Sequence, residues 1–550
     1  MQRTLLPFLL LIGWVATPAA AQQLTLDDIV ERSRQAEATL ITNVRNFKPM
    51  VEIYIQNMAP DAQLGVVPTE DSYVLGRFDW RNGPRLQALA GGKESPRFSG
   101  AGRNKDLEYI PDGFAAMAAP DWQMLEKSRY EFKLVRREFL GEVRCWVIDV
   151  KPLKDIKDGF AGRIWVEERG FNIVRFNGIN RRIERLLFKK AVTFHVDSWR
   201  VNVSPGLWLP SYIHCEESEG MDPTAPSQKP RFKSQIRLWG YASTEAIAGS
   251  QFTSIEISEP TVKDQAEQER QLSPVQSQRR WEQEAETNVL ERLGRARLLA
   301  APGDVEKVLE TVLNNLIVTN ELVLDRPVHA RVLLTSPLES FTVGQTIVLS
   351  RGLIDVLPDE ASLAMMLAHE LGHIALGHPL INQQFAFADR MMISDEELLK
   401  VLKVKRDVKE ETAADAKVVE MLKRSPYKDK LSDAGLFLRM ISARSKQLQN
   451  LIQPHIGDHM TDGGQMMRLN ELMQQSPELA PDNLGQVAAL SLGARLILDP
   501  WTSRLELLRA ASVAASSIRE KVPLAVTPLT PFLKYADVVA DTTPARTSNP

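Results

Sequence analysis

The stretch LAMMLAHELGHIALGH, residues 363–378, predicts a buried helix that presents a metal site. Apolar side chains surround most of its circumference, as is typical of a helix inside a core. His369 and His373 are four residues apart, so their imidazoles lie on one face and can hold one ion. Glu370 can reach a water on that ion, and the H-E-x-x-H pattern is typical of a zinc site with its own general base. The alternative is a pair of core histidines with local hydrogen bonds, since buried imidazoles need either partners or a metal.

The flanking residues indicate where this helix begins and ends. Asp359 is suited to cap the N-terminus, and Pro379 cannot continue the helix beyond His378. His378 follows His373 by five residues, which is about 140° around a helix, so we expect it to face away from the two histidines. It is therefore predicted to be a helix-end or packing residue and not a ligand.

A catalytic zinc also needs a third protein ligand and an open position for water. A metzincin would supply a histidine six residues after His373, where this chain has a proline. A gluzincin would supply a glutamate from a later helix, and Glu411 in the segment EETAAD fits that requirement. Asp415, one turn further on, could accept a hydrogen bond from a ligating histidine and so orient it. The small residues Ala413 and Ala414 would let the two helices approach closely.

H-E-L-G-H followed by E-x-x-A-D resembles the gluzincin peptidases that include the CAAX prenyl proteases, the HtpX-type proteases and the periplasmic BepA-like proteases. The segments 331–341 and 342–353 resemble the paired strands that precede the metal helix in that family, and the edge strand there would hold a substrate backbone by strand addition. The resemblance covers residues 303 to 475. It implies a zinc endopeptidase with one Zn²⁺ per chain and Glu370 as the general base.

The same family usually carries a late H-P-x-x-x-x-R-[IL] element near the metal. This chain has His459 and Arg468 in that order, with a longer spacing and no proline after the histidine. The resemblance therefore makes both residues candidates for a transition-state or structural role, with His455 as an alternative to His459. A loop histidine and a helix-surface arginine are the other interpretation of the same residues.

The N-terminus predicts export. Residues 1–21 combine an early arginine, an apolar run and the sequence AAA before a cleavage position, as is typical of a secretory signal peptide. No later segment has about 18 uninterrupted apolar residues, so no transmembrane segment is expected after signal removal. We therefore expect an exported protein, in a bacterial periplasm. A net charge of −3 gives no indication of nucleic-acid binding.

The whole pattern predicts a multidomain α+β protein. Alternation typical of antiparallel strands fills the first half after an initial helical stretch, with turns at 140–142 and 168–170. This half-barrel-like part resembles the LolA-type outer-membrane lipoprotein carriers, which have an apolar concave face. Cys145 and Cys215 both lie in strand-like segments, where one disulfide and two buried free thiols are both possible.

We divide the chain into a signal peptide and five further parts. They are a β-rich accessory domain (22–260), a connecting helical segment (261–302), a mainly helical gluzincin domain with a small edge sheet (303–478), a C-terminal helical segment (479–540) and a disordered tail (541–550).

Together these features predict an exported zinc metalloendopeptidase that cleaves envelope or misfolded proteins. Its expected partners are protein or peptide substrates, with outer-membrane proteins or lipoproteins among them. Two alternatives follow from the same sequence. One is a lipid- or lipoprotein-binding carrier, and the other is a zinc-dependent chaperone in which proteolysis is gated or minor.

Overall fold

The structure is a computed structural model of the chain. It describes residues 24–81, 85–90, 114, 117–118, 125–154, 159–183, 191–217, 231–241, 273–378, 406–453, 455–457, 459–462, 464–486, 488–508, 517–518, 521–529 and 533–536. The predicted signal peptide and the predicted tail lie outside these residues.

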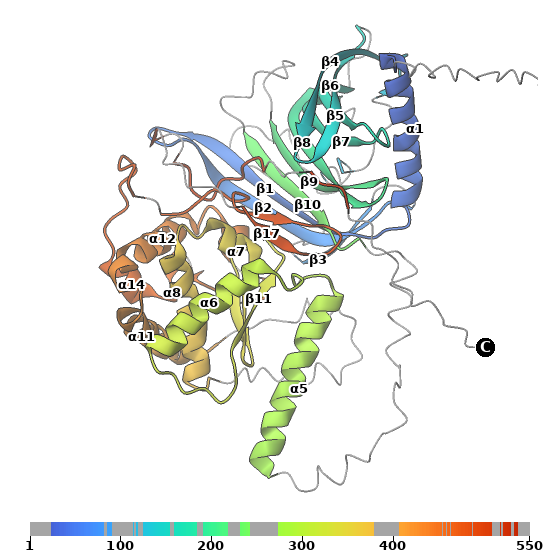
Figure 1. Ribbon diagram of the computed structural model, residues 1–550. Helices are drawn as coiled ribbons and strands as arrows, with labels where there is room; N and C mark the ends of the chain where they lie inside the picture. The colour runs from blue at the N-terminus through green and yellow to red at the C-terminus, as the bar shows by residue number, and fades with distance from the viewer. Residues whose placement is uncertain are drawn as a thin grey trace, which may run out of the picture.

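An antiparallel sheet of ten strands forms the first half of the molecule, in the order β3-β2-β1-β10-β9-β8-β7-β6-β5-β4. The sheet is open, because β3 and β4 are its two edges, and this confirms the predicted antiparallel half-barrel-like part (Figure 1). The strand bounds are β1 Met50–Asp61, β2 Gly65–Asp79, β3 Arg85–Ala90, β4 Tyr130–Leu140, β5 Val143–Pro152, β6 Gly159–Glu167, β7 Ile173–Ile183, β8 Ala191–Ser204, β9 Leu207–Glu217 and β10 Phe232–Trp239.

The two faces of this sheet pack against different partners. Helix α1, Leu26–Val44, covers one face, where its residues share a core with Val51 and Ile53 of β1. Side chains alternate between the faces along a strand. Met50 and Tyr54 therefore point to the opposite face, where they join the core of the helical half.

The second half is mainly helical and contains a small mixed sheet in the order β11-β13-β12. Helix α8 lies at its centre, in contact with α6, α11 and α12. This agrees with the predicted helical domain and its edge sheet. The bounds are α5 Pro274–Arg295, α6 Asp304–Thr319, β11 His329–Leu333, β12 Ser340–Val343, β13 Thr346–Ser350, α7 Arg351–Val356, α8 Glu360–Ala375, α11 Val408–Arg424, α12 Leu431–Arg444, α13 Gln449–Ile452, β14 Thr461–Asp462, β15 Gln465–Met466, α14 Asn470–Gln475, β16 Leu496–Leu498 and β17 Leu505–Leu507.

The large sheet lies beside the helical half (Figure 1), and the two halves share one apolar core. A buried ion pair also joins them. Arg351 at the start of α7 places Nη2 2.7 Å from Oε2 of Glu52 on β1, and both side chains are fully buried. Ser336 donates to the same carboxylate from its backbone N and its Oγ, at 2.5 and 2.7 Å. The large sheet is therefore fixed directly to the elements that carry the candidate site.

The structure refines the connecting segment, corrects the C-terminal segment and decides between the two alternatives for the cysteines. Within the predicted connecting segment 261–302, helix α5 begins at Pro274, where proline is favourable because its missing N–H has no partner there in any case. The C-terminal segment 479–540 is not helical in its described part, which contains the strands β16 and β17 and extended chain. Cys145 and Cys215 are free and buried, and they belong to different apolar clusters, so the disulfide is excluded.

Candidate metal centre

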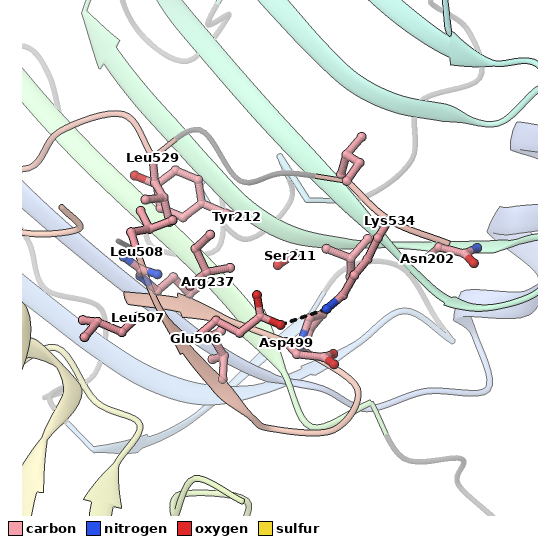
Figure 2. Close-up of a pocket in the computed structure, with 15 residues that line it drawn as sticks. Asn202, Ser211, Tyr212, Arg237, Asp499, Glu506, Leu507, Leu508, Leu529 and Lys534 are labelled. Atoms are coloured by element: carbon pink, nitrogen blue, oxygen red, sulfur yellow. Dashed lines mark hydrogen bonds and ion pairs between the residues drawn. The ribbon is translucent and has the colours of Figure 1, made fainter. Parts of the chain in front are cut away.

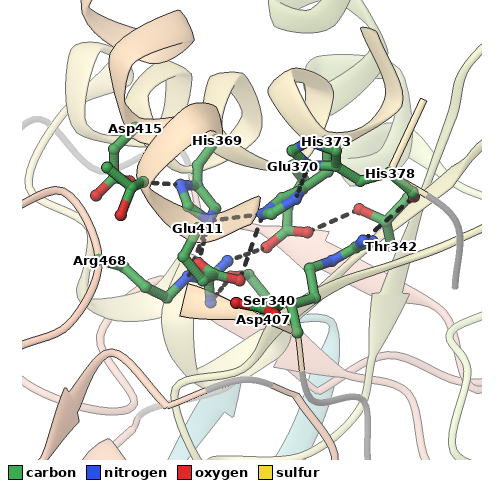
Figure 3. Close-up of polar contacts among 12 residues, drawn as sticks. Ser340, Thr342, His369, Glu370, His373, His378, Asp407, Glu411, Asp415 and Arg468 are labelled. Carbon is green, nitrogen blue, oxygen red and sulfur yellow. Dashed lines mark hydrogen bonds and ion pairs between the residues drawn. The ribbon is translucent and has the colours of Figure 1, made fainter. Parts of the chain in front are cut away.

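Helix α8 supplies three of the site residues. Asp359 caps it as predicted, accepting a hydrogen bond from the backbone N of Ser362 at 2.7 Å. Along the helix, His369 and His373 fall on one face, with Glu370 beside them (Figure 3). The three side chains are buried, with at most 1% of their surface exposed.

Helix α11 brings the fourth residue, Glu411, against the two histidines. Its Oε2 lies 3.1 Å from Nε2 of His369, and its Oε1 lies 3.5 Å from Nε2 of His373. The two Nε2 atoms are 3.2 Å apart. Ligand atoms that surround zinc tetrahedrally at about 2.0–2.1 Å lie about 3.3 Å from one another. These spacings are close to those that one zinc ion requires, and the three side chains form the group of possible metal ligands that the described residues contain.

Asp415 lies behind His369, as the sequence predicted. Its Oδ1 is 3.0 Å from Nδ1 of His369, which leaves Nε2 of the same ring for the metal. The other carboxylate oxygen accepts a hydrogen bond from the backbone N of Leu469 at 2.6 Å. Leu469 adopts a left-handed backbone conformation, with φ of 60°, directly after Arg468. Asp415 thus positions a ligand and an adjacent arginine together.

Arg468 enters the site although its sequence spacing departs from the family pattern. Its Nη2 donates to Oε1 of Glu370 at 2.6 Å, and its Nε lies 3.0 Å from Oε2 of Glu411. Burial alone raises the pKa of Glu370, but Arg468 and the two histidines outweigh it and hold the pKa at about 2. Burial and the neighbouring His369 lower the pKa of His373 to about 3, which keeps it in the neutral form that binds metal.

Strand β12 contributes two site contacts that sequence reasoning missed. Thr342 donates from Oγ1 to Oε2 of Glu370 at 2.7 Å, and Oγ of Ser340 lies 3.4 Å from Nη1 of Arg468 (Figure 3). Both residues alternate with a buried phenylalanine, so they share the face of the strand that looks toward α8. The sequence gave no signal for these two contacts, because they depend on how strand β12 packs against helix α8.

The prediction that His378 faces away from His373 is wrong. Helix α8 ends at Ala375, and Gly377 takes a left-handed conformation with φ of 66°. The backbone N of His378 then bonds to the carbonyl of His373, and that of Gly377 to Ile374, which is a Schellman ending. This turn folds His378 back, so that its Nδ1 lies 3.0 Å from Nδ1 of His373. His378 thereby contacts the outer nitrogen of a ligand.

The two other histidines proposed from the late family element occupy different surroundings. His455 stacks on Tyr73 of the large sheet, with ring centroids 5.1 Å apart, and its backbone N donates to Glu339. His459 is exposed, whereas the ligand cluster is buried. A structural role fits His455, and the role of His459 stays a prediction.

The close approach of α8 and α11 makes a testable prediction. Ala414 is fully buried opposite Gly372. A Cβ built on Gly372 would lie only 3.3 Å from the carbonyl oxygen of Ala414, so the helices are in close contact there. Ala413, in contrast, is exposed. Overpacking of such a contact costs about 1–3 kcal/mol. We expect Ala414→Leu to move Glu411 away from the histidines and to weaken zinc binding at least about tenfold, measured by titration against a competing chelator. Ala413→Leu adds the same volume to the exposed face and should bind zinc normally; equal losses in both variants would contradict the packing argument.

Comparison with protein families gave a match within the second half of the chain. Residues 305–453 match the model of Peptidase family M48. The matched segment contains His369, Glu370, His373 and Glu411, while Arg468 lies beyond it. This part of the chain is therefore similar to the metalloproteases of Peptidase family M48.

Comparison with solved structures gave similar chains of low identity. A LolA superfamily protein from Nitrosomonas europaea is 12% identical, and the match covers 40% of this chain and 94% of the other, with a TM-score of 0.19. A DUF1329 family protein from Desulfovibrio piger is 10% identical over 41% and 97% of the chains, with a TM-score of 0.18. The complex of Pseudomonas aeruginosa MucA and MucB gave 7% identity over 38% and 93%, with a TM-score of 0.12. Similarity at such low TM-scores gives no information about the function of this chain. A comparison with curated proteins gave no match.

Proposed function

We propose that this protein is an exported zinc-dependent metalloendopeptidase that cleaves envelope or misfolded proteins. The observation that carries the proposal is the mutual spacing of Nε2 of His369, Nε2 of His373 and the Glu411 carboxylate, at 3.1–3.5 Å, with Glu370 next to them. Three protein ligands beside a general base are the arrangement of a catalytic zinc site, in which the fourth position is left for water.

The residues around the ligands have separate roles in peptide-bond hydrolysis. Zinc, when bound, acidifies water and polarises the scissile carbonyl. Glu370 is ionised at neutral pH, so it can accept a proton from the attacking water and deliver it to the leaving nitrogen. Arg468 carries the positive charge nearest to this carboxylate, and a donor of that kind stabilises the negative charge that develops on the carbonyl oxygen.

Strand β12 offers a way to hold an extended substrate. It is an edge of its small sheet, since it pairs with β13 alone among the described strands, and it runs beside α8. An extended peptide can add to such an edge through backbone hydrogen bonds. This arrangement would place a scissile bond near Glu370, because Thr342 of the same strand already contacts that residue.

Location is a further part of the proposal. The signal-like sequence of residues 1–21 supports export, and the periplasm of a bacterium is the compartment that we propose. In the described part of the chain, every helix is too short or too polar to cross a membrane.

Metal removal tests the proposed activity. Purified protein should contain one zinc per chain by elemental analysis, and it should cleave casein or an unfolded envelope protein. Treatment with 1,10-phenanthroline should abolish cleavage, and added zinc should restore it while added magnesium should not. Cleavage that persists in metal-free protein would refute the zinc mechanism.

Burial of the site favours a second candidate, the zinc-dependent chaperone in which proteolysis is gated. The two histidines and Glu370 are at most 1% exposed, and Glu411 is 8% exposed, so a bound substrate must reach a covered centre. An aggregation assay separates the two functions. A zinc-dependent chaperone would suppress aggregation of an unfolded client while zinc is bound, even in a Glu370→Gln variant that does not cleave, and would lose this activity when zinc is removed.

A further inference from the structure

A cavity of about 180 Å³ lies between the large sheet and the C-terminal part of the chain (Figure 2). Strands β8, β9 and β10 form one wall, with Tyr212 and Arg237 among the lining residues, and the chain around β16 and β17 forms the other. Tyr212 and Arg237 lie on the sheet face opposite α1, because their neighbours Ile213 and Ile236 belong to the core beneath α1. Its lining residues include none of the metal-centre residues, so the cavity is separate from that centre.

The walls of the cavity are largely apolar. Leu498 on β16 and Leu529 and Leu533 on the following chain are at most 6% exposed, and they line the cavity together with Tyr212. An engineered cavity of about 150 Å³ with such a lining can take up benzene. This cavity can therefore hold a short alkyl or aromatic group.

Arg237 gives the cavity a buried cation. Only 3% of its surface is exposed, its Nε has no hydrogen-bond partner, and its Nη2 makes one long contact of 3.4 Å to the neutral amide of Gln235. The guanidinium lies 4.9 Å from the ring centroid of Tyr212. No carboxylate of the described residues lies within ion-pair distance of it, although buried charges are normally paired.

The nearest buried carboxylates are already engaged. Glu52 is paired with Arg351 and also accepts two hydrogen bonds from Ser336. Asp355 accepts backbone hydrogen bonds from Gly493 and Arg495, at 2.5 and 2.7 Å. Neither carboxylate forms an ion pair or hydrogen bond with Arg237, so the guanidinium can donate hydrogen bonds to another acceptor.

The acidic residues that line the cavity are engaged as well. Glu506 forms an ion pair of 2.9 Å with Lys534, and both side chains are more than half exposed, so this pair lies at the rim (Figure 2). Asp499 accepts hydrogen bonds from the backbone N of Trp501 and from the backbone N and hydroxyl of Thr502. The positive charge of Arg237 therefore dominates the inner end of the cavity.

We propose that this cavity binds a small organic anion, a carboxylate or phosphate carried on a short alkyl chain, with Arg237 as its counter-ion. The head group would occupy the unused donors of the guanidinium, which forms two parallel hydrogen bonds with either kind of anion. The alkyl chain would lie against Tyr212 and the leucines, with its end toward the rim. This binding does not depend on the peptidase activity.

The full-length protein tests the proposal with sodium octanoate as the probe. Isothermal titration should show one saturable site, and the thermal midpoint should rise with octanoate concentration, because a ligand that binds the folded state alone stabilises it. Octanol should bind at least tenfold more weakly and acetate should give no shift. Octyl phosphate in parallel tells which head group the site prefers. Failure of both octanoate and octyl phosphate to bind would overturn the proposal.

Two variants locate the site. Arg237→Met should lose octanoate binding at least tenfold while its thermal midpoint without ligand stays the same or rises, since an unpaired buried charge is removed. Arg163→Met deletes a guanidinium from a partly exposed pair with Asp149 on another part of the sheet, and it should bind octanoate like the wild type. Leu529→Trp, which fills the cavity and keeps Arg237, should also abolish binding. Unchanged octanoate affinity in Arg237→Met or in Leu529→Trp would refute the assignment.

Discussion

Replacing Glu370 with glutamine is expected to lower peptide-bond cleavage about a thousandfold and to leave the zinc content unchanged. The glutamine has the same shape and keeps an oxygen that can accept a hydrogen bond from Thr342 or Arg468. It cannot accept a proton from water, so the general-base step fails. Because Glu370 is not one of the three ligands, His369, His373 and Glu411 should still hold the metal.

The matched control for this variant is Glu420→Gln. Glu420 is an exposed glutamate on the same helix as Glu411, and it pairs with Lys417 at the surface. Its replacement should leave cleavage and zinc content as they are. Turnover should be measured with a fluorogenic peptide, and zinc by elemental analysis of the same preparation. Cleavage by Glu370→Gln at the wild-type rate would show that another group acts as the base.

Much of the site could be predicted from local sequence. A spacing of four residues places His369 and His373 on one face of any helix. Glu411 and Asp415 have the same spacing on a second helix, and they add the third ligand and the group that orients His369. Arg468 was named on family resemblance, and the structure brings it into the cluster. The antiparallel strands of the first half also followed from alternation and glycine turns.

The remaining contacts of the site could not be predicted from local sequence, because they depend on the tertiary fold. Thr342 reaches Glu370 across a strand–helix contact, and His378 reaches His373 because Gly377 reverses the chain. The C-terminal segment has enough apolar residues for helices, but Leu529 and Leu533 pack instead in the core that contains Trp208 of the large sheet. Burial against an existing surface thus overrides helix propensity.

The junction between the large sheet and the peptidase domain links sheet packing to site geometry. Ser336, which contacts Glu52, lies four residues before Ser340 at the start of β12. Arg351 begins α7, and α7 leads into α8 with its metal ligands. The backbones are closely packed here, since a Cβ at Gly352 would lie only 1.7 Å from the carbonyl oxygen of Ser336. A disturbance of this junction should therefore reach both β12 and α8.

Removal of one partner of the buried pair is expected to cost about 3–5 kcal/mol of unfolding free energy, because the other charge is left buried without a counter-ion. Arg351→Met and Glu52→Gln should each lower the urea midpoint strongly and reduce cleavage. The double variant Glu52→Gln with Arg351→Met should recover much of the loss, since it leaves neither charge behind. Arg163→Met, which breaks a partly exposed pair with Asp149 on the same large sheet, should change stability by at most about 1 kcal/mol. If the losses of the two single variants simply add in the double variant, the pair does not act as a unit, and the link that we infer between the sheet and the peptidase domain is wrong.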